Sequence, residues 1–386
     1  MSRDGNTRMR LKADEVELIK QVRSGLSIGQ SEALLRKQVL ELRSEVRALS
    51  QSSADFERLD MIFREHTDFV DKNPQEPWLT TAPSEDAGWG SGVLTLMISD
   101  WHLGEVTTSE QTAGVNVYNA EVAKQRLATV ASGAVEMATQ FKGATYHGIV
   151  LNLLGDLCHG ELHDNREFND LTSIQATVVA MDAIMSLIDT LRKGLGNIPI
   201  HVNGLCGNHD RMSTYRTKTK GATADSHAWL IYKLIERAYA QDPDITFTIL
   251  DSHSLLYRVY GRTFLASHGD ENKGGNSLLH GVANAFMSAV LRKRKQWTSL
   301  GVNIDTAVWG HFHTYSVGQN YNYISNGCIC GTNEYSQKFN FGHERPSQTM
   351  FLTGTNGDIV WCLPVYAGKH STGVKNPKWL EVHKGF

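Results

Sequence analysis

Five short clusters in this chain combine aspartate, histidine and asparagine, the residue types that bind metals and move protons. In chain order they read SDWHLG, GDLCHGELHDN, GNHDR, ASHGD and GHFHT. Each fragment alone is a weak signal, since a lone aspartate after a strand more often caps a helix. Mixed carboxylate, imidazole and amide groups suit manganese, iron or zinc and do not suit calcium or magnesium cages. The order of all five clusters therefore indicates a metal site.

The elements that must position these clusters can be predicted from hydrophobic periodicity. Most clusters directly follow a short apolar run, and helical stretches separate the first runs. Alternating strands and helices predict an α/β fold with a largely parallel sheet, in which sites form beyond the carboxyl ends of the strands. The expected elements are strands at 93–99, 148–154 and 198–206, helices at about 119–141, 170–194 and 276–297, and a β-rich texture after residue 243.

The five blocks, in this order, resemble the calcineurin-like metallophosphoesterase superfamily over about residues 93–315. The resemblance implies two sheets packed as a sandwich, flanked by helices, with two divalent ions at the strand ends; we expect Mn²⁺, with Fe²⁺ or Zn²⁺ as alternatives. Asp156 would bridge the two ions. The ligands implied for one ion are Asp100, His102, Asp156 and His313, and those for the other are Asp156, Asn208, His268 and His311.

The resemblance also implies catalytic roles. His209 would protonate the leaving oxygen or steady the transition state, and Asp210 would orient His209 or its loop. Two divalent ions with two aspartate ligands carry a charge of about +2, which attracts a phosphodiester anion.

His159 separates the branches of that superfamily. Protein phosphatases have GDxVDRG at this block, whereas this chain reads GDLCHGE, with His159 in place of the second aspartate and no following arginine. A histidine here is similar to the double-strand-break repair nucleases and to phage-type members, so we expect His159 to act near the scissile phosphate. An imidazole adds no negative charge beside an anionic substrate and can donate a hydrogen bond.

Basic residues near the clusters are candidates for contact with a substrate phosphate. Arg211 follows the GNHD block, and the run LRKRKQW ends a predicted amphipathic helix. This run fits either a phosphate-contacting patch or a solvated helix end favoured by the helix dipole. His163 either extends the His159 surface or belongs to a solvated loop. The candidate substrate-binding residues are His163, Arg211, Arg292, Lys293 and Arg294.

The chain outside these blocks gives coarser expectations. A 4–3–4–3 apolar spacing within 1–70 predicts a helical appendage, either a coiled coil that joins two copies or a helix packed on its own domain. Residues 71–92 are expected to be a linker, 93–335 the catalytic domain, and 336–386 closing strands and a tail packed on it. The pair Cys328 and Cys330 is expected to alternate along a strand.

Composition favours a cytoplasmic protein. The net charge of −3 excludes a globally basic nucleic-acid binder, five irregularly spaced cysteines argue against a disulfide framework, and no run of 18 apolar residues predicts a membrane span. The function we predict is a two-metal phosphodiesterase that cuts DNA, either single-stranded or at ends. The alternatives are a small-molecule or cyclic-nucleotide phosphodiesterase or phosphatase, and a non-catalytic scaffold that binds partners through its N-terminal helix.

Overall fold

The structure is a computed structural model, and it describes residues 90–141, 144–160, 168–212, 225–272, 281–338 and 342–368. The predicted N-terminal helix, nearly all of the linker at 71–92, and His163 lie outside these ranges. The side chains of 281–285 are also outside the description, although their backbone is helical.

The first sheet has six strands in the order β11-β10-β1-β2-β3-β4. The four strands β1 to β4 run parallel, and β10 and β11 are added antiparallel beside β1. The C-terminal strands thus complete the same sheet that carries the first three clusters. The bounds are β1 Ser91–Ile98, β2 Thr145–Leu153, β3 Ile200–Gly204, β4 Ile245–Ile249, β10 Ser347–Gly354 and β11 Ile359–Tyr366.

The second sheet has five strands in the order β5-β6-β7-β9-β8. Its centre, β6-β7-β9, is parallel, and its two edge strands are antiparallel to their neighbours. The two central strands β6 and β7 therefore deliver their carboxyl ends in one direction. The bounds are β5 Ser254–Val259, β6 Arg262–Ser267, β7 Thr306–Trp309, β8 Ser316–Val317 and β9 Tyr323–Ser325.

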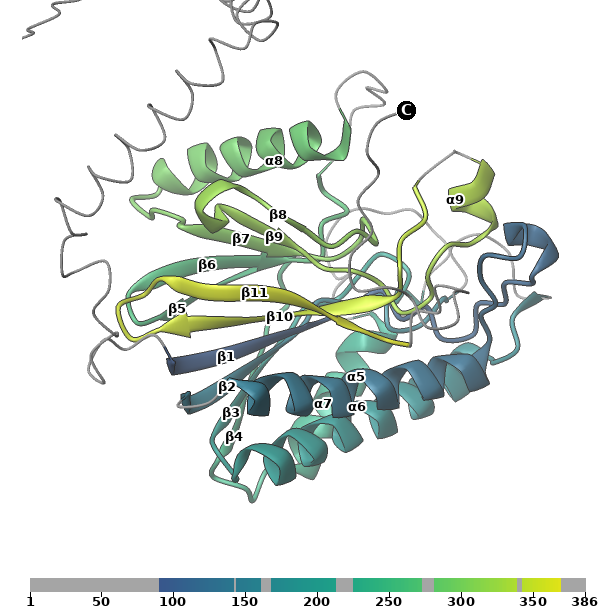
Figure 1. Cartoon of the computed structure of the whole chain (residues 1–386), viewed down its shortest axis with the longest axis horizontal. Coiled ribbons are helices and arrows are strands. Elements are labelled where there is room, and N and C mark those ends of the chain that lie inside the picture. Colours follow the sequence, from purple (N-terminus) through teal and green to yellow (C-terminus); the bar gives the residue numbers. More distant parts are fainter. Residues whose placement is uncertain are drawn as a thin grey trace, which may run out of the picture. The chain divides into compact units, whose positions relative to one another are not determined.

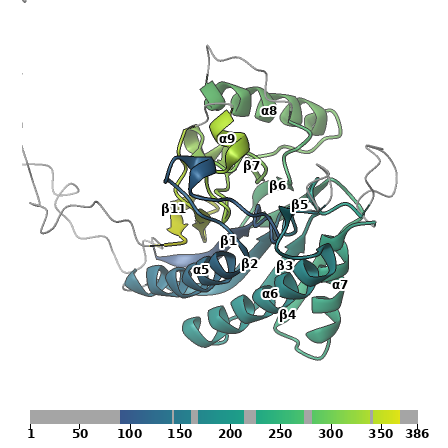
Figure 2. The ribbon, with the colours of Figure 1, turned by 90° about the vertical axis from the view of Figure 1, so that its right-hand side faces the viewer.

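Helices cover the outer faces of both sheets, as Figure 1 shows. Helices α5, α6 and α7 lie side by side over the first sheet, and α8 lies over the second (Figure 2). The predicted sandwich flanked by helices is confirmed, while α7 has no counterpart among the predicted elements. The bounds are α5 Ala120–Gln140, α6 Ser173–Leu195, α7 His227–Ala238 and α8 Gly281–Thr298, with short helices η2 Glu110–Thr112, η4 Gln319–Tyr321 and α9 Glu334–Lys338.

Helix α6 illustrates how local sequence sets these elements. Thr172 and Gln175 form a capping box at its start, and Gly196 ends it in a left-handed conformation. Among the described helices, α6 alone has the length and apolar composition of a membrane span. Its residues Ile184 and Ile188 are fully buried within the hydrophobic core that it shares with the first sheet. Burial of that kind is typical of a core helix of a globular domain.

Three hydrophobic clusters fill the spaces between the layers. The largest lies between the first sheet and α5 to α7, and it includes Leu96, Leu151 and Ile231. A second fills the space between the sheets, with Phe264 stacked on Phe351. The third, around Trp309 and Phe286, joins the second sheet to α8. Because these cores fix both sheets, the strand ends that carry the polar clusters are held in place.

Candidate metal centre

The polar clusters follow strands of both sheets and meet at one edge of the sandwich. Three of the strands, β1, β2 and β3, belong to the first sheet, and β6 and β7 belong to the second. Each cluster begins within four residues of the end of its strand. The predicted ligands that the structure places here are Asp100, His102, Asp156, Asn208, His268, His311 and His313.

Most of these ligands have an unusual backbone conformation. Ten non-glycine residues have a positive φ in the described part of the chain, and half of them are predicted ligands. Left-handed conformations are uncommon for non-glycine residues, although Asn, Asp and His adopt them more readily than others. Such residues concentrate at functional sites, where the surrounding structure holds them. The five are Asp100 (φ 56°), His102 (49°), Asp156 (52°), His311 (67°) and His313 (57°).

Two glycines allow the loops after β2 and β3 to touch. Gly155 has φ +87°, and a Cβ added to it would collide with the backbone of Gly207. A Cβ on Gly207 would in turn collide with the carboxylate of Asp156. The glycines of GDLCH and GNHD are therefore needed for the close approach of the two loops.

One group of donors gathers around Asp100. His102 Nε2 lies 3.1 Å from His313 Nε2. His313 Nε2 lies 3.5 Å from Asp100 Oδ1, and His102 Nε2 lies 3.9 Å from Asp156 Oδ2. Asp100 is itself fixed by the backbone N–H of His311, 3.0 Å from both carboxylate oxygens, and by the hydroxyl of Ser99 at 2.5 Å.

A second group gathers on the other side of Asp156. His268 Nε2 lies 3.0 Å from Asp156 Oδ2 and 3.2 Å from Asn208 Oδ1. His268 Nδ1 donates to the carbonyl of Leu154 at 2.7 Å, which directs Nε2 into the site. His311 completes this group, with one ligand atom from each of Asp156, His268 and His311 within 4.8 Å of the others.

The two groups share Asp156 and fit two divalent metal ions. Donor atoms of Asp100, His102 and Asp156 also lie within 4.8 Å of one another, so Asp156 belongs to both sets. Both aspartates are essentially inaccessible to solvent, and unpaired buried carboxylates are unfavourable. Oxygen and imidazole donors in this ratio suit Mn, Fe or Zn.

Burial and mutual charge set the protonation of the site in the chain without metal. Burial raises the pKa of Asp100 to about 6, although the neighbouring His313 and His268 lower it. Burial disfavours charge on His268, yet Asp156 outweighs it and raises the pKa of His268 well above its usual value. The pKa of His313 rises to about 10 beside Cys328 and Asp100, again against burial. Protons on these two histidines thus balance the charge of the buried carboxylates and, for His313, that of Cys328.

The pKa values of the other two ligand histidines are lowered instead. Burial lowers the pKa of His102 well below its usual value, with help from His209 and His313. Burial, followed by the charge of His268, lowers the pKa of His311 to about 3. These two imidazoles are therefore neutral at pH 7, the form that binds metals.

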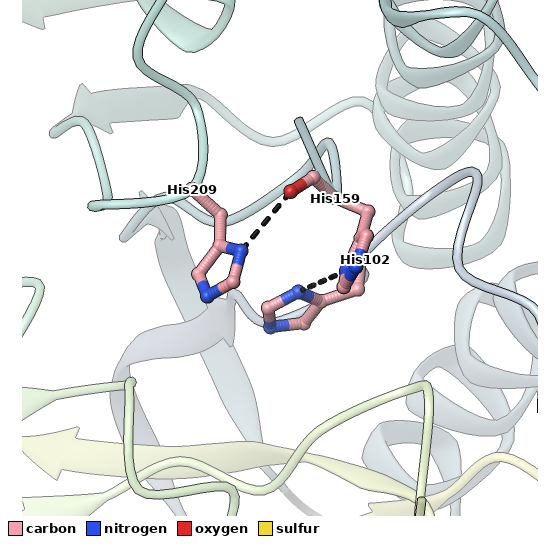
Figure 3. A group of neighbouring side chains, drawn as sticks. All are labelled: His102, His159 and His209. Atoms are coloured by element: carbon pink, nitrogen blue, oxygen red, sulfur yellow. Dashed lines mark hydrogen bonds between the residues drawn. The ribbon is translucent and has the colours of Figure 1, made fainter. Parts of the chain in front are cut away.

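His159 and His209 stand together beside His102, as Figure 3 shows. His209 Nδ1 donates to the carbonyl oxygen of His159 at 3.0 Å, which fixes the plane of its ring and leaves Nε2 on the opposite edge. His159 Nδ1 lies 3.3 Å from His102 Nδ1. The backbone N–H of His209 donates to Asp156 Oδ1 at 2.7 Å. The two predicted catalytic histidines thus border the metal centre directly.

Asp210 is a buried anchor for the loops that carry the ligands. Its carboxylate accepts the backbone N–H groups of Asp156 at 2.6 Å and Gly207 at 3.0 Å. It also accepts those of Leu157 and Cys158 at 3.0 and 3.1 Å. Of the two roles expected for Asp210, these contacts correspond to orienting the loops.

Two further side chains reach the site without having been predicted. Glu105 Oε1 accepts a hydrogen bond from Asn333 Nδ2 at 2.8 Å, and Glu105 Oε2 lies 3.9 Å from His159 Nδ1. Cys330 Sγ lies 3.7 Å from His313 Nδ1. The expectation that Cys328 and Cys330 alternate along a strand is wrong, because β9 ends at Ser325 and both thiols are buried in the bend that follows. Of these residues, only Glu105 could have been suspected from the sequence, because it directly follows the DWHLG motif.

Among the predicted substrate contacts, Arg211 is the residue next to the site. Its Nη2 lies 3.2 Å from Asp270 Oδ2, which joins the loop after β3 to the loop after His268. His163 lies outside the described residues.

The basic end of α8 is arranged differently from the patch that the sequence suggested. Lys293 is buried, and its Nζ pairs with Glu271 and lies 3.2 Å from Ser267 Oγ. Arg294 donates to the carbonyls of Ile304 and Asp305, at 3.0 and 2.8 Å, next to the start of β7. Arg292 is exposed. Lys293 and Arg294 thus make structural contacts within the domain.

No family model and no curated protein matches this chain. Solved structures that are similar to it include an archaeal phosphodiesterase, with 10% identity over 70% of this chain and 99% of its own length and a TM-score of 0.29. A dimetal phosphatase from Danio rerio is 10% identical over 72% and 99%, with a TM-score of 0.32. Vacuolar protein sorting 29 from Cryptosporidium parvum is 11% identical over 67% and 84%, with a TM-score of 0.26. Likenesses this distant do not define an activity, so the function is inferred from the site.

Proposed function

We propose that this chain is a two-metal phosphoesterase of the calcineurin-like superfamily that hydrolyses phosphodiester bonds. The observation that carries the proposal is the sharing of Asp156 between two groups of donors, one with Asp100 and His102 and one with His268 and His311. When bound, two divalent ions, most suitably Mn²⁺, would neutralise the phosphate charge and lower the pKa of water enough to supply a nucleophile near neutral pH.

The chain's own residues provide orientation and proton transfer. The Nδ1 of His209 is fixed by the carbonyl of His159, and we assign to Nε2, on the opposite edge of the ring, the donation of a hydrogen bond or a proton to the leaving oxygen. Asp210 holds the Asp156 loop through three of its backbone amides and accepts a fourth from Gly207 in its own loop, so the two loops stay in register. His159 borders the same space and adds no negative charge beside an anionic substrate.

We further propose that the substrate is DNA, single-stranded or at its ends. The feature that supports this is His159 at the block where protein phosphatases carry an aspartate, now placed against His102 in the site. The exposed Arg292 and the partly exposed Arg211 are the remaining candidate phosphate contacts among the predicted residues that the structure describes.

One observation favours the alternative, a small-molecule or cyclic-nucleotide phosphodiesterase. Lys293 and Arg294 are engaged inside the domain, which removes two of the charges expected to line a nucleic-acid groove. Nucleic-acid binding depends on several phosphate contacts, so the loss of two is significant.

A substrate panel decides between these proposals. Purified protein with Mn²⁺, Mg²⁺ or Zn²⁺ is offered single-stranded DNA, duplex DNA, RNA, cyclic nucleotides and bis-p-nitrophenyl phosphate, with His209→Ala as the catalytic control. Cleavage of DNA that His209→Ala abolishes supports the nuclease. Turnover of bis-p-nitrophenyl phosphate and cyclic nucleotides without DNA cleavage rejects the nuclease and retains the phosphoesterase. Turnover of no substrate with any of the metals rejects both.

A further inference from the structure

A pair of buried thiols lies behind the metal centre, in the bend after β9. Cys330 is 0% exposed and Cys328 is 1% exposed. Cys330 Sγ lies 3.7 Å from His313 Nδ1. Cys328 Sγ accepts the backbone N–H of Gly331 at 3.3 Å. Neither thiol has a part in the phosphoesterase chemistry proposed above.

The bend is anchored to the rest of the domain, so the position of Cys330 is determined by the fold. Asn116 Nδ2 and Arg126 Nη1 both donate to the carbonyl of Cys330, at 2.8 and 2.9 Å. The backbone N–H of Ile329 donates to the carbonyl of Asp100 at 3.1 Å. The thiol bend is thereby tied directly to the residue that holds the first metal-ligand group.

The two nitrogens of His313 have separate partners. Nε2 faces His102 Nε2 at 3.1 Å and Asp100 Oδ1 at 3.5 Å. Nδ1, on the other edge of the ring, faces Cys330 Sγ at 3.7 Å, and the neighbouring Cys328 also forms a side-chain hydrogen bond with His313. A ligand histidine commonly donates its second ring N–H to an acceptor, which fixes the tautomer and the ring orientation. Carbonyl and carboxylate oxygens usually fill that role, whereas a thiol sulfur is a weak acceptor.

We propose that Cys330 is a positioning residue of the metal centre, whose sulfur accepts the Nδ1–H of His313 and so directs Nε2 to the metal. The inference rests on the proposed two-metal function, because it assigns His313 as a ligand. Donor atoms of His102, His313 and Cys330 lie within 4.8 Å of one another, so direct ligation by sulfur is the competing arrangement. Sulfur placed against Nδ1, and not against Nε2, favours the hydrogen bond.

The first test compares metal affinity in Cys330→Ala and Cys330→Ser. Affinity for Mn²⁺ and Zn²⁺ is measured by competition with a chelator on the full chain, with Cys362→Ala as the matched control. Cys362 lies on β11, where its Sγ is 4.0 Å from the hydroxyl of Tyr315. We expect Cys330→Ala to weaken one of the two sites about 10- to 100-fold. Cys330→Ser, whose oxygen can accept the same hydrogen bond, should stay much closer to the wild type.

The second test uses the wild-type protein, so it can be carried out even if neither variant folds. Wild-type protein loaded with Co²⁺ should show no sulfur-to-cobalt charge-transfer absorption, since the thiol binds the imidazole and not the ion. A charge-transfer band would overturn the proposal in favour of direct ligation, and an unchanged affinity in Cys330→Ala would overturn it as well. If the wild type bound no metal at all, the phosphoesterase proposal itself would fail, an outcome distinct from both.

Discussion

Two regions of this chain carry dense polar motifs, and the fold uses them differently. The strand-end clusters come from five segments far apart in the sequence, and their donor atoms gather at one edge of the sandwich. The basic end of α8 is one contiguous run, yet its side chains disperse. Lys293 is buried in an ion pair, Arg294 binds backbone carbonyls, and Arg292 is exposed.

The contrast follows from the geometry of the two kinds of element. Parallel strands bring their carboxyl ends to one edge, so residues after different strands are neighbours however far apart they lie in the chain. Successive residues on a helix instead point about 100° apart, so four adjacent bases cannot form one patch. A charge run on a helix is therefore a poorer guide to a binding surface than a set of strand ends.

We expect the largest effect from removing a residue that borders the metal site without binding an ion. His209→Ala should lower kcat on a phosphodiester by about 10²- to 10⁴-fold, the usual contribution of a positioned acid or base. Metal content should stay at the wild-type level, since His209 is outside both donor groups that share Asp156. Steady-state kinetics and elemental analysis on the same preparation give both quantities. A loss of metal equal to the loss of activity would show that His209 supports the ions instead.

Metal binding should release protons, which distinguishes the strand-end region from a merely acidic surface. The pKa values of His268 and His313 are raised in the metal-free chain, that of His313 to about 10, so both imidazoles carry protons at pH 7. Metal requires the neutral imidazole, so affinity should rise with pH by about tenfold per unit for each proton released, and fall as pH falls. Calorimetry in two buffers of different ionisation enthalpy counts the protons. Affinity independent of pH between 6 and 8 would contradict this reading.

Glu105 offers a smaller and more specific effect. Glu105→Gln should reduce kcat about tenfold, because the carboxylate near His159 Nδ1 no longer supports that imidazole, and it should leave metal content unchanged. Asn333→Ala, which frees Glu105 Oε1, should shift kcat in the same direction by less. Equal losses of metal and activity in Glu105→Gln would indicate general damage to the site.

Substitutions at the basic end of α8 should change the stability of the domain and leave its hydrolytic activity unchanged. Lys293→Ala leaves Glu271 without its partner and should lower the free energy of unfolding by about 1–2 kcal/mol, since the pair is partly exposed. Arg292→Ala should change neither stability nor hydrolysis measurably. Chemical denaturation measures the stability of both variants, and steady-state kinetics measures their activity, with Arg292→Ala as the control for Lys293→Ala. A severalfold loss of DNA cleavage in Arg292→Ala would restore the helix end as a substrate surface.

Local patterns in the sequence predicted an α/β fold and the strands that precede the site motifs, whereas the two-sheet sandwich was implied by the resemblance of those motifs to the metallophosphoesterase superfamily. Apolar runs mark the strands, and the residue that follows each run is placed by the sheet. Contacts between distant segments left no such pattern. Glu105 meets Asn333 from 228 positions away, and Cys330 meets His313 only because the bend after β9 folds behind it. Helix α7 was not among the predicted elements, although the spacing of its buried residues Ala228, Ile231 and Ile235 is that of a helix.

The metal content of the wild type and of Asp156→Asn shows directly whether Asp156 is shared by two ions. Asp156 belongs to both donor groups, so its carboxylate should be required by both ions. We predict two equivalents of divalent metal per wild-type chain after loading and gel filtration, and one or none in a folded Asp156→Asn variant, with phosphodiester hydrolysis lost. Two equivalents retained in Asp156→Asn, or none in the wild type, would contradict the account.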